Sequence, residues 1–420
     1  MSPIRPAVTV LGRRIGAEDQ RLRDFLTRIA QPYEWLEAGT PAADALLARL
    51  GAEGAELPAL LEDGELMESA TVERVVEAWQ ATATPSRSSY DLVVVGAGPA
   101  GLAAAVYAAS DGLETLIVEE DLPGGQASHT SLIENFFGFP DGIGGAELSR
   151  LAGRQAERFG AELVFLRGVT GSSHEPDRPF KAEIAGGYAV EAPVAIASPG
   201  MVWRRLEVPE LDELLGHGVL YGAGRSEAAQ CSNEDVIVVG AGNSAGQAAM
   251  HLADAGARVT MLVRGDRLGK SMSAYLVDRI ARHHLIEVRL RTEVHAVEAE
   301  EGWLSGVVVR GPENGLERLS ARMMFLCLGG VPRTGWASET GVRVDAAGFV
   351  LTGPDLLVDG RRPEGWPLAR DPLALETSVP GLFAAGDVRH GSTKRVAGAV
   401  GEGAMAAALV HRRLEELTQS

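Results

Sequence analysis

Two segments of the chain place glycines at a fixed spacing directly after an apolar run, and they limit what it can fold into. The first covers residues 91–102, where Gly96, Gly98 and Gly101 follow a run of apolar residues. An apolar strand, a tight glycine turn and an Ala-rich helix form the start of a dinucleotide-binding unit. The first glycine permits the turn, the second lets the backbone approach a pyrophosphate, and the third lets helix and strand pack closely.

The residues around this turn extend the same prediction. Pro99 and Ala100 begin the helix, whose free N–H groups and positive dipole end attract phosphates. A second apolar strand, residues 116–118, leads to Glu119, which lies 18 residues after Gly101. A carboxylate is expected there to bind a ribose, so Glu119 is assigned to the same nucleotide.

The second segment repeats the pattern near the middle of the chain. Gly240, Gly242 and Ala245 fit the spacing G-x-G-x-x-A, again between an apolar strand and a helix. Asn243 and Ser244 lie at the start of that helix, where phosphate oxygens would be held. Two such units predict an α/β chain with two Rossmann-like dinucleotide-binding domains.

The second unit carries a basic residue where the first carries an acid. Residues 259–263 form its next apolar strand, and Arg264 ends it, with Arg267 and Lys270 nearby. An acid at this corner binds the ribose 2′-OH of NAD, whereas an arginine accommodates the 2′-phosphate of NADP. Arg264 therefore favours NADPH, with NADH possible, although a solvated surface charge would look the same in the sequence.

Charge and cysteine content restrict the partners. The net charge of −18 argues against nucleic acid or an acidic membrane as a partner. No apolar run approaches the roughly 18 residues of a membrane span, and no signal-peptide core is present, so we expect a cytoplasmic protein. Cys231 and Cys327 are the only cysteines. They provide no disulfide framework and no metal site, and we expect both to be buried.

Residues 1–80 predict a small α/β module with the order βαβαββα. This order, with Pro58 opening the third strand, resembles a glutaredoxin or thioredoxin-like domain and implies a cis Leu57–Pro58 bond. The redox dithiol would follow the first strand, but residues 12–17 contain no cysteine. A docking, dimerising or regulatory role remains. Because the polar residues 81–89 read as a flexible linker, we expect the module to be dispensable for reduction of a flavin.

A more specific resemblance begins after the first unit. Pro-Gly-Gly-Gln at residues 123–126, followed by Ile-Glu-Asn at residues 133–135, resembles the flavin-facing loop of low-molecular-weight bacterial thioredoxin reductases. These enzymes belong to the FAD/NAD(P)-dependent pyridine nucleotide-disulfide oxidoreductase superfamily. The resemblance implies that FAD is the first nucleotide and that Gly125, Gln126 and Asn135 lie near its isoalloxazine ring.

Two later segments continue this resemblance. The family has Ala-Thr-Gly where the first half closes, and this chain has Ala-Ser-Pro-Gly at residues 197–200, which retains Gly200. Gly386 and Asp387 end a predicted strand and match the second flavin signature, in which the aspartate binds the ribityl chain.

The last helix begins just after Lys394, Arg395 and Val396 and continues to about residue 417. In the family the matching turn contacts the flavin, so these three residues are assigned to FAD. A helix N-terminus aimed at the flavin stabilises the negative charge that collects there on reduction.

The chain departs from the family in one functional group. A thioredoxin reductase carries Cys-x-x-Cys just before the second dinucleotide unit, but residues 218–226 contain no cysteine. The resemblance covers residues 90–418 and includes both nucleotide sites, but not the group that hands electrons to a disulfide. We therefore assign no catalytic side chain to the protein.

We expect a three-layer FAD/NAD(P)-binding fold preceded by the thioredoxin-like module. The FAD domain takes residues 90–207 and 336–420, and the NAD(P) domain takes residues 208–335. The predicted function is hydride transfer from NADPH to FAD and on to a small-molecule or protein acceptor, in a homodimer. The alternatives are a flavoprotein reduced by a protein donor such as ferredoxin, a redox-sensing flavoprotein, and a thioredoxin-disulfide reductase.

Overall fold

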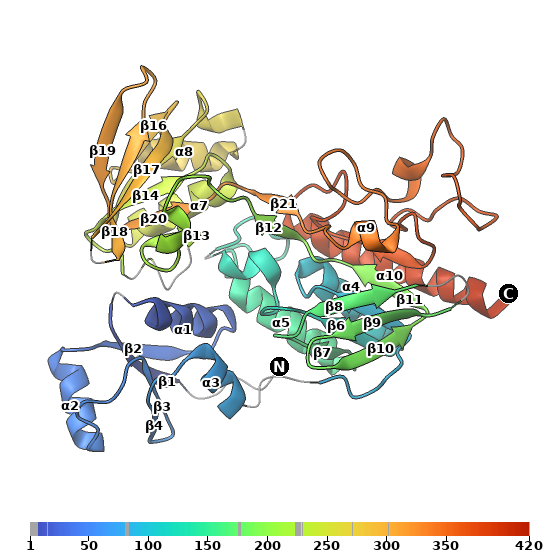
Figure 1. Cartoon of the computed structure of the whole chain (residues 1–420), viewed down its shortest axis with the longest axis horizontal. Coiled ribbons are helices and arrows are strands. Elements are labelled where there is room, and N and C mark those ends of the chain that lie inside the picture. Colours follow the sequence, from blue (N-terminus) through green and yellow to red (C-terminus); the bar gives the residue numbers. More distant parts are fainter. Residues whose placement is uncertain are drawn as a thin grey trace.

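The chain forms three α/β bodies, which Figure 1 shows at the lower left, upper left and right. The computed structural model describes residues 7–14, 16–79, 84–130, 132–174, 178–222, 228, 230–270, 272–300 and 302–419. We call the bodies the N-terminal module (residues 7–79), the first dinucleotide unit (the sheet that contains β5, with its helices) and the second dinucleotide unit (the sheet that contains β14, with its helices).

The N-terminal module has the expected order of elements and one four-stranded sheet, β2-β1-β3-β4. β1 runs parallel to β2 and antiparallel to β3. The β3–β4 hairpin turns at Asp63 and Gly64, which both have positive φ, and the Leu57–Pro58 bond is cis as expected. Its elements are β1 Val8–Gly12, α1 Ala17–Arg28, β2 Tyr33–Glu37, α2 Pro41–Leu50, β3 Ala59–Glu62, β4 Glu65–Met67 and α3 Val72–Ala78.

Part of the segment read as a linker is anchored. Residues 80–83 lie outside the described residues, but Ser86 donates from its backbone N and its Oγ to the carboxylate of Glu162, at 2.6 and 2.7 Å. The Tyr90 hydroxyl donates to the same carboxylate at 2.6 Å. The chain is therefore fixed to the first dinucleotide unit from Ser86 onward.

The first dinucleotide unit is built on a five-stranded parallel sheet with the order β22-β11-β5-β6-β7. A separate three-stranded antiparallel sheet, β10-β9-β8, accompanies it. The elements are β5 Leu92–Val95, α4 Pro99–Ser110, β6 Thr115–Val118, η1 Gly125–His129, α5 Gly145–Arg158, β7 Glu162–Val164, β8 Val169–Ser173, β9 Phe180–Ile184, β10 Tyr188–Ala192, β11 Val194–Ala197, α9 Ala337–Thr340, η4 Gly353–Leu356, β22 Leu382–Ala384 and α10 Val396–Gln419.

Helices α4 and α10 cross in very close contact. A Cβ added to Gly403 of α10 would lie 2.1 Å from the backbone oxygen of Ala100 in α4, so no side chain fits between them. Both helices begin at the carboxyl end of the sheet, because each follows one of its strands. Two helix N-termini thus meet at the same edge of the first unit.

The second dinucleotide unit has a similar parallel sheet with the order β13-β20-β14-β15-β16, and an antiparallel sheet, β17-β18-β19, beside it. Its elements are η2 Leu211–Leu214, β13 Val219–Tyr221, β14 Asp235–Val239, α7 Asn243–Asp254, β15 Arg258–Val263, η3 Leu268–Lys270, α8 Ala274–Arg282, β16 Ile286–Leu290, β17 Glu293–Glu300, β18 Trp303–Arg310, β19 Leu316–Ser320 and β20 Met323–Leu326.

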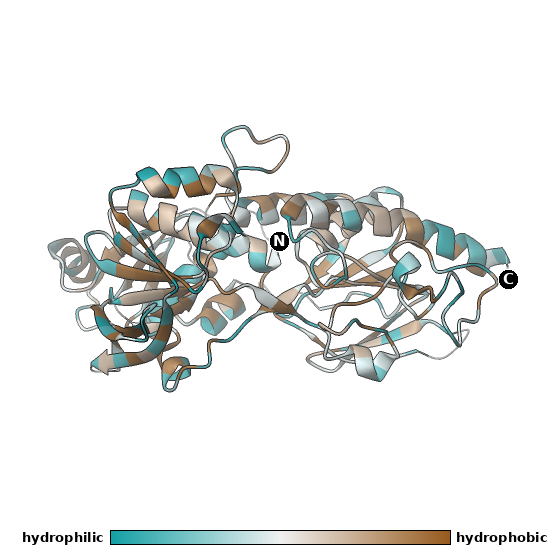
Figure 2. Cartoon of the chain, turned by 90° about the horizontal axis from the view of Figure 1, so that it is seen from above, coloured by the Kyte–Doolittle hydropathy of each residue, from teal (hydrophilic) through white to brown (hydrophobic). Residues whose placement is uncertain are grey.

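The chain passes twice between the two units, and the crossings pair with each other. β12 (Met201–Trp203) leaves the first unit and β21 (Gly330–Pro332) returns to it, as an antiparallel pair that Figure 1 shows between the two bodies. In Figure 2 the strands are mostly hydrophobic, whereas the helix turns next to the C-terminus are hydrophilic. Among the described residues, no helix has both the length and the apolar character that a membrane span requires.

Candidate dinucleotide sites

The three glycines of the first unit differ in what surrounds them. Gly96 has φ +101, and a Cβ there would lie 2.4 Å from Ser198 O; a Cβ on Gly101 would lie 1.9 Å from Gly96 O. Both positions therefore exclude any side chain for packing reasons. Gly98 has no atom within 4 Å of its Cβ position, so its backbone borders open space.

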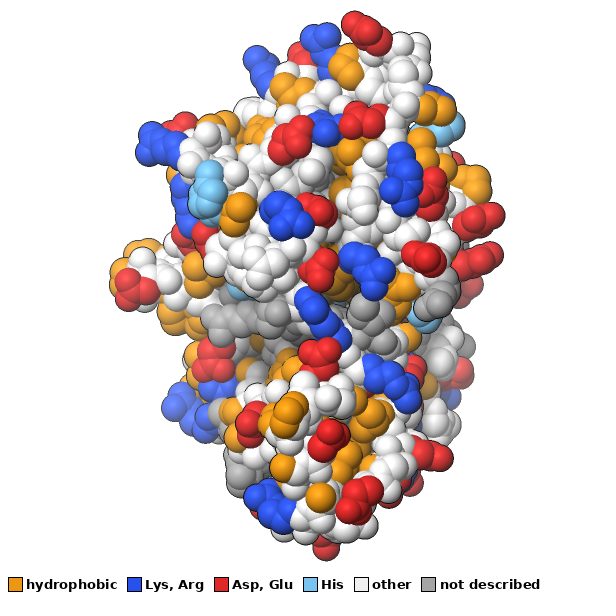
Figure 3. All heavy atoms as spheres, turned by 90° about the vertical axis from the view of Figure 1, so that its left-hand side faces the viewer, with side chains coloured by type: hydrophobic (Ala, Val, Ile, Leu, Met, Phe, Trp, Pro, Cys, Tyr) orange, Lys and Arg blue, Asp and Glu red, His pale blue; other side chains and the backbone are white. Residues whose placement is uncertain are grey.

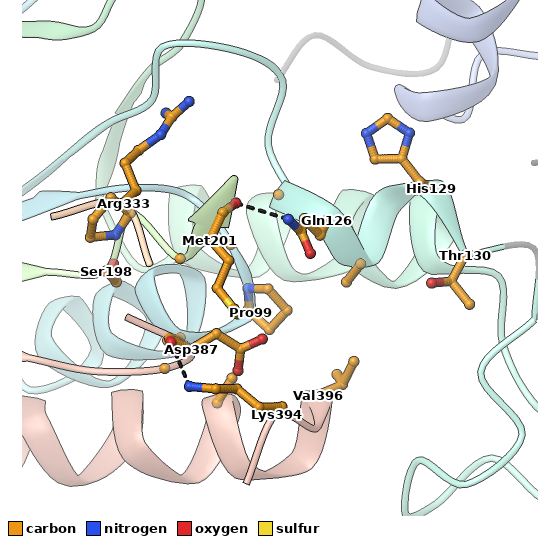
Figure 4. Close-up of a pocket in the computed structure, with 18 of the residues that line it drawn as sticks. Pro99, Gln126, His129, Thr130, Ser198, Met201, Arg333, Asp387, Lys394 and Val396 are labelled. Atoms are coloured by element: carbon orange, nitrogen blue, oxygen red, sulfur yellow. Dashed lines mark hydrogen bonds between the residues drawn. The ribbon is translucent and has the colours of Figure 1, made fainter. Parts of the chain in front are cut away.

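That open space belongs to a cavity of about 410 Å³ at the N-termini of α4 and α10. Figure 4 shows side chains of its wall, with Asp387 and Lys394 facing the α4 start and Gln126 and His129 on the opposite wall. Twelve residues assigned to FAD from the sequence line it: Gly98, Pro99, Ala100, Glu119, Gly125, Gln126, Gly200, Gly386, Asp387, Lys394, Arg395 and Val396.

Three assigned residues do not line this cavity: Gly96 and Gly101, whose Cβ positions are closed by backbone atoms, and Asn135. Asn135 is exposed and does not line it. The reason is the bridge between Ile133 and Ile143, whose backbone groups exchange hydrogen bonds of 2.8 and 3.1 Å and close the intervening residues into a surface loop. Asn135 therefore lies on a surface loop outside this cavity, and its contact with the flavin stays a prediction.

Glu119 and Asp387 are the two carboxylates of the cavity that the sequence singled out. Glu119 accepts hydrogen bonds from the backbone N–H of Ala97 at 2.7 Å and of Asp121 at 3.0 Å, and burial raises its pKa. Burial also raises the pKa of Asp387. Lys394 Nζ donates to the Asp387 backbone oxygen at 2.6 Å, and burial lowers the pKa of this lysine. The cavity thus holds acidic and basic groups in a poorly hydrated setting.

Ser198 binds the backbone of the first glycine turn, a role that the sequence pattern indicated only indirectly. Its Oγ lies 3.1 Å from Val95 O and 3.0 Å from Gly96 O and donates to these carbonyls at the end of β5. The hydroxyl therefore fixes the glycine turn. The signal was present, because Ser198 stands where the family has a threonine with the same hydroxyl.

His129 and Arg28 also line the cavity, and the sequence analysis did not identify either. The His129 ring meets the Trp203 ring edge to face, with 6.2 Å between centroids. Burial, together with the neighbouring Arg28, lowers the pKa of His129 to about 4, so its imidazole is neutral at pH 7. No sequence signal marks Arg28, because it comes from α1 of the N-terminal module.

The second unit repeats the geometry of the first. Gly240 has φ +146 and a Cβ there would lie 2.4 Å from Cys327 O, whereas Gly242 has no atom within 4 Å of its Cβ position. The Asn243 side-chain oxygen accepts from the Ser273 backbone N–H at 2.7 Å, and Ala245 is fully buried. The start of α7 is therefore shaped like the start of α4, with an open glycine at its N-cap.

This second site opens toward the first cavity. Ser244, Gln247 and Ala248 of α7 line the same 410 Å³ space as Gly98 and Asp387. Arg264 is exposed at the end of β15, as are Arg267 and Lys270. The structure therefore brings α7 to the first site and leaves the basic corner accessible to a ligand.

A larger cavity, of about 820 Å³, lies where the N-terminal module meets both dinucleotide units. Residues of α1, of the segment 128–130 and of the segment 215–221 line it. Arg28, His129 and Thr130 line this cavity and also the 410 Å³ cavity, so the two spaces are neighbours.

Neither cysteine side chain lines either cavity. Cys231 and Cys327 are both buried, as expected. Burial raises the pKa of the Cys327 thiol to about 12. Residues 223–227, within the stretch where the family dithiol would lie, are outside the described residues, and their sequence contains no cysteine. Among the His, Cys, Asp and Glu side chains that are described, no group of three is placed to hold a metal ion.

Comparison with known proteins agrees with this geometry. The family model for pyridine nucleotide-disulphide oxidoreductases matches residues 90–403. The thioredoxin reductase of Bacillus subtilis is 30% identical over 334 residues, which cover 79% of this chain and 96% of that protein. The thioredoxin reductase of Treponema pallidum is 32% identical over 321 residues, covering 76% of this chain and 95% of that protein.

Solved structures show the same relationship. The crystal structure of Lactococcus lactis thioredoxin reductase in its FR conformation superimposes with a TM-score of 0.69 at 28% identity, and covers 78% of this chain and 99% of that one. The thioredoxin reductase of T. acidophilum gives a TM-score of 0.68 at 25% identity. The chain therefore belongs to the pyridine nucleotide-disulphide oxidoreductase family, as a flavoprotein oxidoreductase similar to the low-molecular-weight bacterial thioredoxin reductases.

Proposed function

We propose that the chain is an FAD-dependent NADPH oxidoreductase that passes electrons from its flavin directly to an acceptor, without a protein dithiol. The observation that carries the proposal is the shared cavity, which is lined by Gly98 and Asp387 of the first unit and by Ser244 of the second. A hydride donor held at α7 would face a flavin held at α4. Positioning of this kind makes the transfer effectively unimolecular.

The residues present fit FAD. Gly98 offers open backbone, and the Cβ position of Gly125 lies 3.3 Å from Gly98 Cα, so the two glycines keep a narrow passage free of side chains. A pyrophosphate there would lie at the α4 N-terminus, where the helix dipole and free N–H groups favour negative charge. Glu119 and Asp387 line the same cavity. In this proposal Glu119 would bind a ribose and Asp387 the ribityl chain.

NADPH fits the second site for the same reasons, with Gly240, Gly242, Asn243, Ser244 and Ala245 forming the turn and helix start. Arg264 is free to contact the 2′-phosphate, because it is exposed at the end of β15. A guanidinium binds phosphate through paired, charge-assisted hydrogen bonds. This contact supports NADPH over NADH.

The chemistry of hydride acceptance and release is supplied by FAD itself. The protein's part is electrostatic and steric. The α10 N-terminus and Lys394 place positive charge at one end of the cavity, where it would stabilise negative charge on the reduced cofactor. Gln126 donates from its side-chain nitrogen to Met201 O at 2.8 Å, which holds the opposite wall in place. Neutral His129 would be able to donate or accept a hydrogen bond without adding charge to the cavity.

Transfer to the acceptor would not use thiol chemistry, because transfer to a disulfide requires a reactive thiolate and the sequence places none at the site. The 820 Å³ cavity supplies a route for a small acceptor, since Arg28, His129 and Thr130 border both spaces. A protein acceptor would instead bind at the surface where the N-terminal module meets the two dinucleotide units.

We also propose the domain division expected from the sequence. The FAD domain would comprise residues 90–207 and 336–420, the NAD(P) domain residues 208–335, and the module residues 1–80. The paired crossings β12 and β21 support the two boundaries between the FAD and NAD(P) domains. A homodimer remains part of the proposal, to be checked by light scattering.

Stopped-flow reduction tests the function. The purified protein should be yellow, and excess NADPH should bleach the flavin within seconds, followed by reoxidation with a quinone or dye. Persistent yellow colour would instead support reduction by a protein donor or a sensing role. Catalytic reduction of thioredoxin by the same preparation would contradict the proposal and show the activity for which its relatives are named.

A further inference from the structure

Helix α1 of the N-terminal module lies at the junction of all three bodies. Figure 1 shows it on the side of the module that faces the dinucleotide units, and Figure 3 shows the seam between the module and the second unit from the left. On this face acidic and basic side chains are interspersed, so the seam is not a patch of one charge.

The C-terminal end of α1 is fixed to the wall of the first cavity. Arg28 is only 9% exposed; its Nη2 donates to Asp121 Oδ2 at 2.8 Å and its Nε donates to Ser128 Oγ at 3.3 Å. Asp121 and Ser128 flank the turn that carries Gly125 and Gln126. A buried guanidinium paired with both flanks holds this turn in one position.

The middle of α1 is fixed to the second unit. Arg23 is 2% exposed, and its Nη2 donates to the side-chain oxygen of Gln230 at 3.0 Å. Gln230 in turn donates from Nε2 to Gln20 Oε1 at 3.0 Å. Arg14, just before the helix, donates to Gln230 O at 2.8 Å and forms an ion pair with Glu234 at 3.3 Å. Gln230 and Glu234 lie immediately before β14, the strand that leads into the Gly240 turn.

Apolar packing joins the same bodies. Leu22, Phe25 and Leu26 of α1 belong to one contiguous cluster of buried side chains with Ala156 of α5 and Leu163 of β7. The cluster also contains Val10 and Leu60 of the module's own sheet, so the core of the module is continuous with that of the first unit. The module is therefore docked by apolar packing as well as by charged groups.

We propose that α1 is an internal brace, and that Arg23 and Arg28 are positioning residues for hydride transfer. By holding the Gly125 turn at one end and the segment before β14 at the other, the helix keeps α7 facing the first cavity. This proposal rests on the proposed function, because it assigns the brace to the NADPH-to-flavin step. It replaces the expectation that residues 1–80 are dispensable.

Burial of the two arginines favours a brace over recruitment of a partner. A buried guanidinium is costly unless it is paired or hydrogen-bonded. Arg28 finds its nearest carboxylate, Asp121, on the first unit, and Arg23 divides its hydrogen bonds between Gln20 of its own helix and Gln230 of the second unit. An arrangement that separates the bodies therefore removes one partner from each arginine. Hydride transfer depends steeply on geometry, so a small relative displacement is enough to slow it.

The test uses Gln230→Ala, which removes a partner of Arg23 without touching a nucleotide site. We expect the limiting rate of flavin reduction by NADPH to fall at least about tenfold, since a displacement near 1 Å can cost about a hundredfold. FAD content, the Kd for NADPH and reduction of the flavin by dithionite should stay at wild-type values. A merely structural contact would not separate the rate from binding in this way.

The matched control is Arg21→Ala on the same helix. Arg21 is exposed and its bonds to Glu18 and Glu73 stay within the module, so its loss should leave the rate unchanged. If Gln230→Ala reduces its flavin at the wild-type rate, the brace is refuted. If the wild type itself is not reduced by NADPH, the proposed function is refuted. The brace is then tested by backbone hydrogen exchange at Gly125 and Gln126: faster exchange in Gln230→Ala than in the wild type supports it, and equal exchange refutes it.

A second measurement covers the case in which Gln230→Ala folds poorly. In the variant Arg14→Cys/Glu234→Cys, a short bis-maleimide can join the two partly exposed positions, since Cys231 and Cys327 are buried and react slowly. We expect the cross-linked protein to retain its rate of flavin reduction. Loss of reduction on cross-linking, with the uncross-linked variant active, would show that α1 must leave the second unit for transfer, which overturns the brace.

Discussion

Replacing Gly98 with alanine should separate cofactor binding from folding. Gly98 is the N-cap of α4 with φ −70 and ψ −178, a conformation that alanine adopts without strain, and its Cβ would meet no atom within 4 Å. Reduced freedom of the unfolded chain stabilises such a variant by about 0.4–1 kcal/mol. Alanine is a poorer N-cap than glycine by a similar amount, on the order of 0.5–1 kcal/mol. The two effects offset, so the stability of the apoprotein should change by less than about 1 kcal/mol.

Binding of FAD responds differently. The new methyl group would enter the space proposed for the pyrophosphate and lengthen its hydrogen bonds to the α4 N-terminus. Hydrogen bonds to charged groups are worth about 1.5–3 kcal/mol, so the Kd for FAD should rise about ten- to a hundredfold. Urea unfolding of the apoprotein and fluorescence titration with FAD measure the two effects separately.

The second unit provides the control. Gly242 is the N-cap of α7 with φ −86 and ψ 178, and it also has open space at its Cβ position. Gly242→Ala should therefore weaken NADPH binding and leave FAD binding unchanged. Unaltered FAD affinity in Gly98→Ala, or equal effects of both substitutions on FAD, would refute the assignment of the first cavity to this cofactor.

Three further outcomes are expected. Arg264→Ala should raise the KM for NADPH about ten- to a hundredfold and leave the KM for NADH unchanged. Equal KM values for the two cofactors in the wild type would refute the assignment of Arg264 to the 2′-phosphate. Cys231→Ala/Cys327→Ala should turn over NADPH with a quinone at the wild-type rate; loss of turnover would restore a thiol mechanism. Since the pKa of His129 is lowered to about 4, its unfolded form takes up a proton first as pH falls. Stability should therefore decline from about pH 6.5 toward pH 4, with a smaller decline in His129→Asn, as urea unfolding would measure.

The dinucleotide units were predictable because their pattern has a local steric cause. Gly96 and Gly101 must lack side chains wherever a strand turns into a tightly packed helix, so the sequence of each unit reveals its geometry. The hairpin at Asp63 and Gly64 was predictable for the same reason. The end of α1 at Arg28 has no such local mark, because the left-handed residue that follows it is Ala30, φ 53, and not glycine.

The rest of the site depended on contacts between distant segments. Asn135 was assigned by resemblance, but the pairing of Ile133 with Ile143 turns its loop outward. Arg28 reaches the cavity only because α1 docks on two other bodies, and no periodicity in residues 17–28 distinguishes it from a surface arginine. Contacts between side chains of separate bodies leave no pattern in neighbouring residues of the sequence. The docking of α1 could therefore not be predicted from the sequence.

The backbone contact between α4 and α10 has a consequence for biosynthesis. Gly403 and Ala100 come together from segments at opposite ends of the flavin-binding sequence, with the entire second unit translated between them. Domains fold as they emerge from the ribosome, N-terminal parts first. The cavity that we assign to FAD therefore cannot close until the last helix has been released. With FAD bound there, flavin capture would be the final event of maturation, and a chain truncated before α10 would leave the ribosome colourless even with its glycine turn intact.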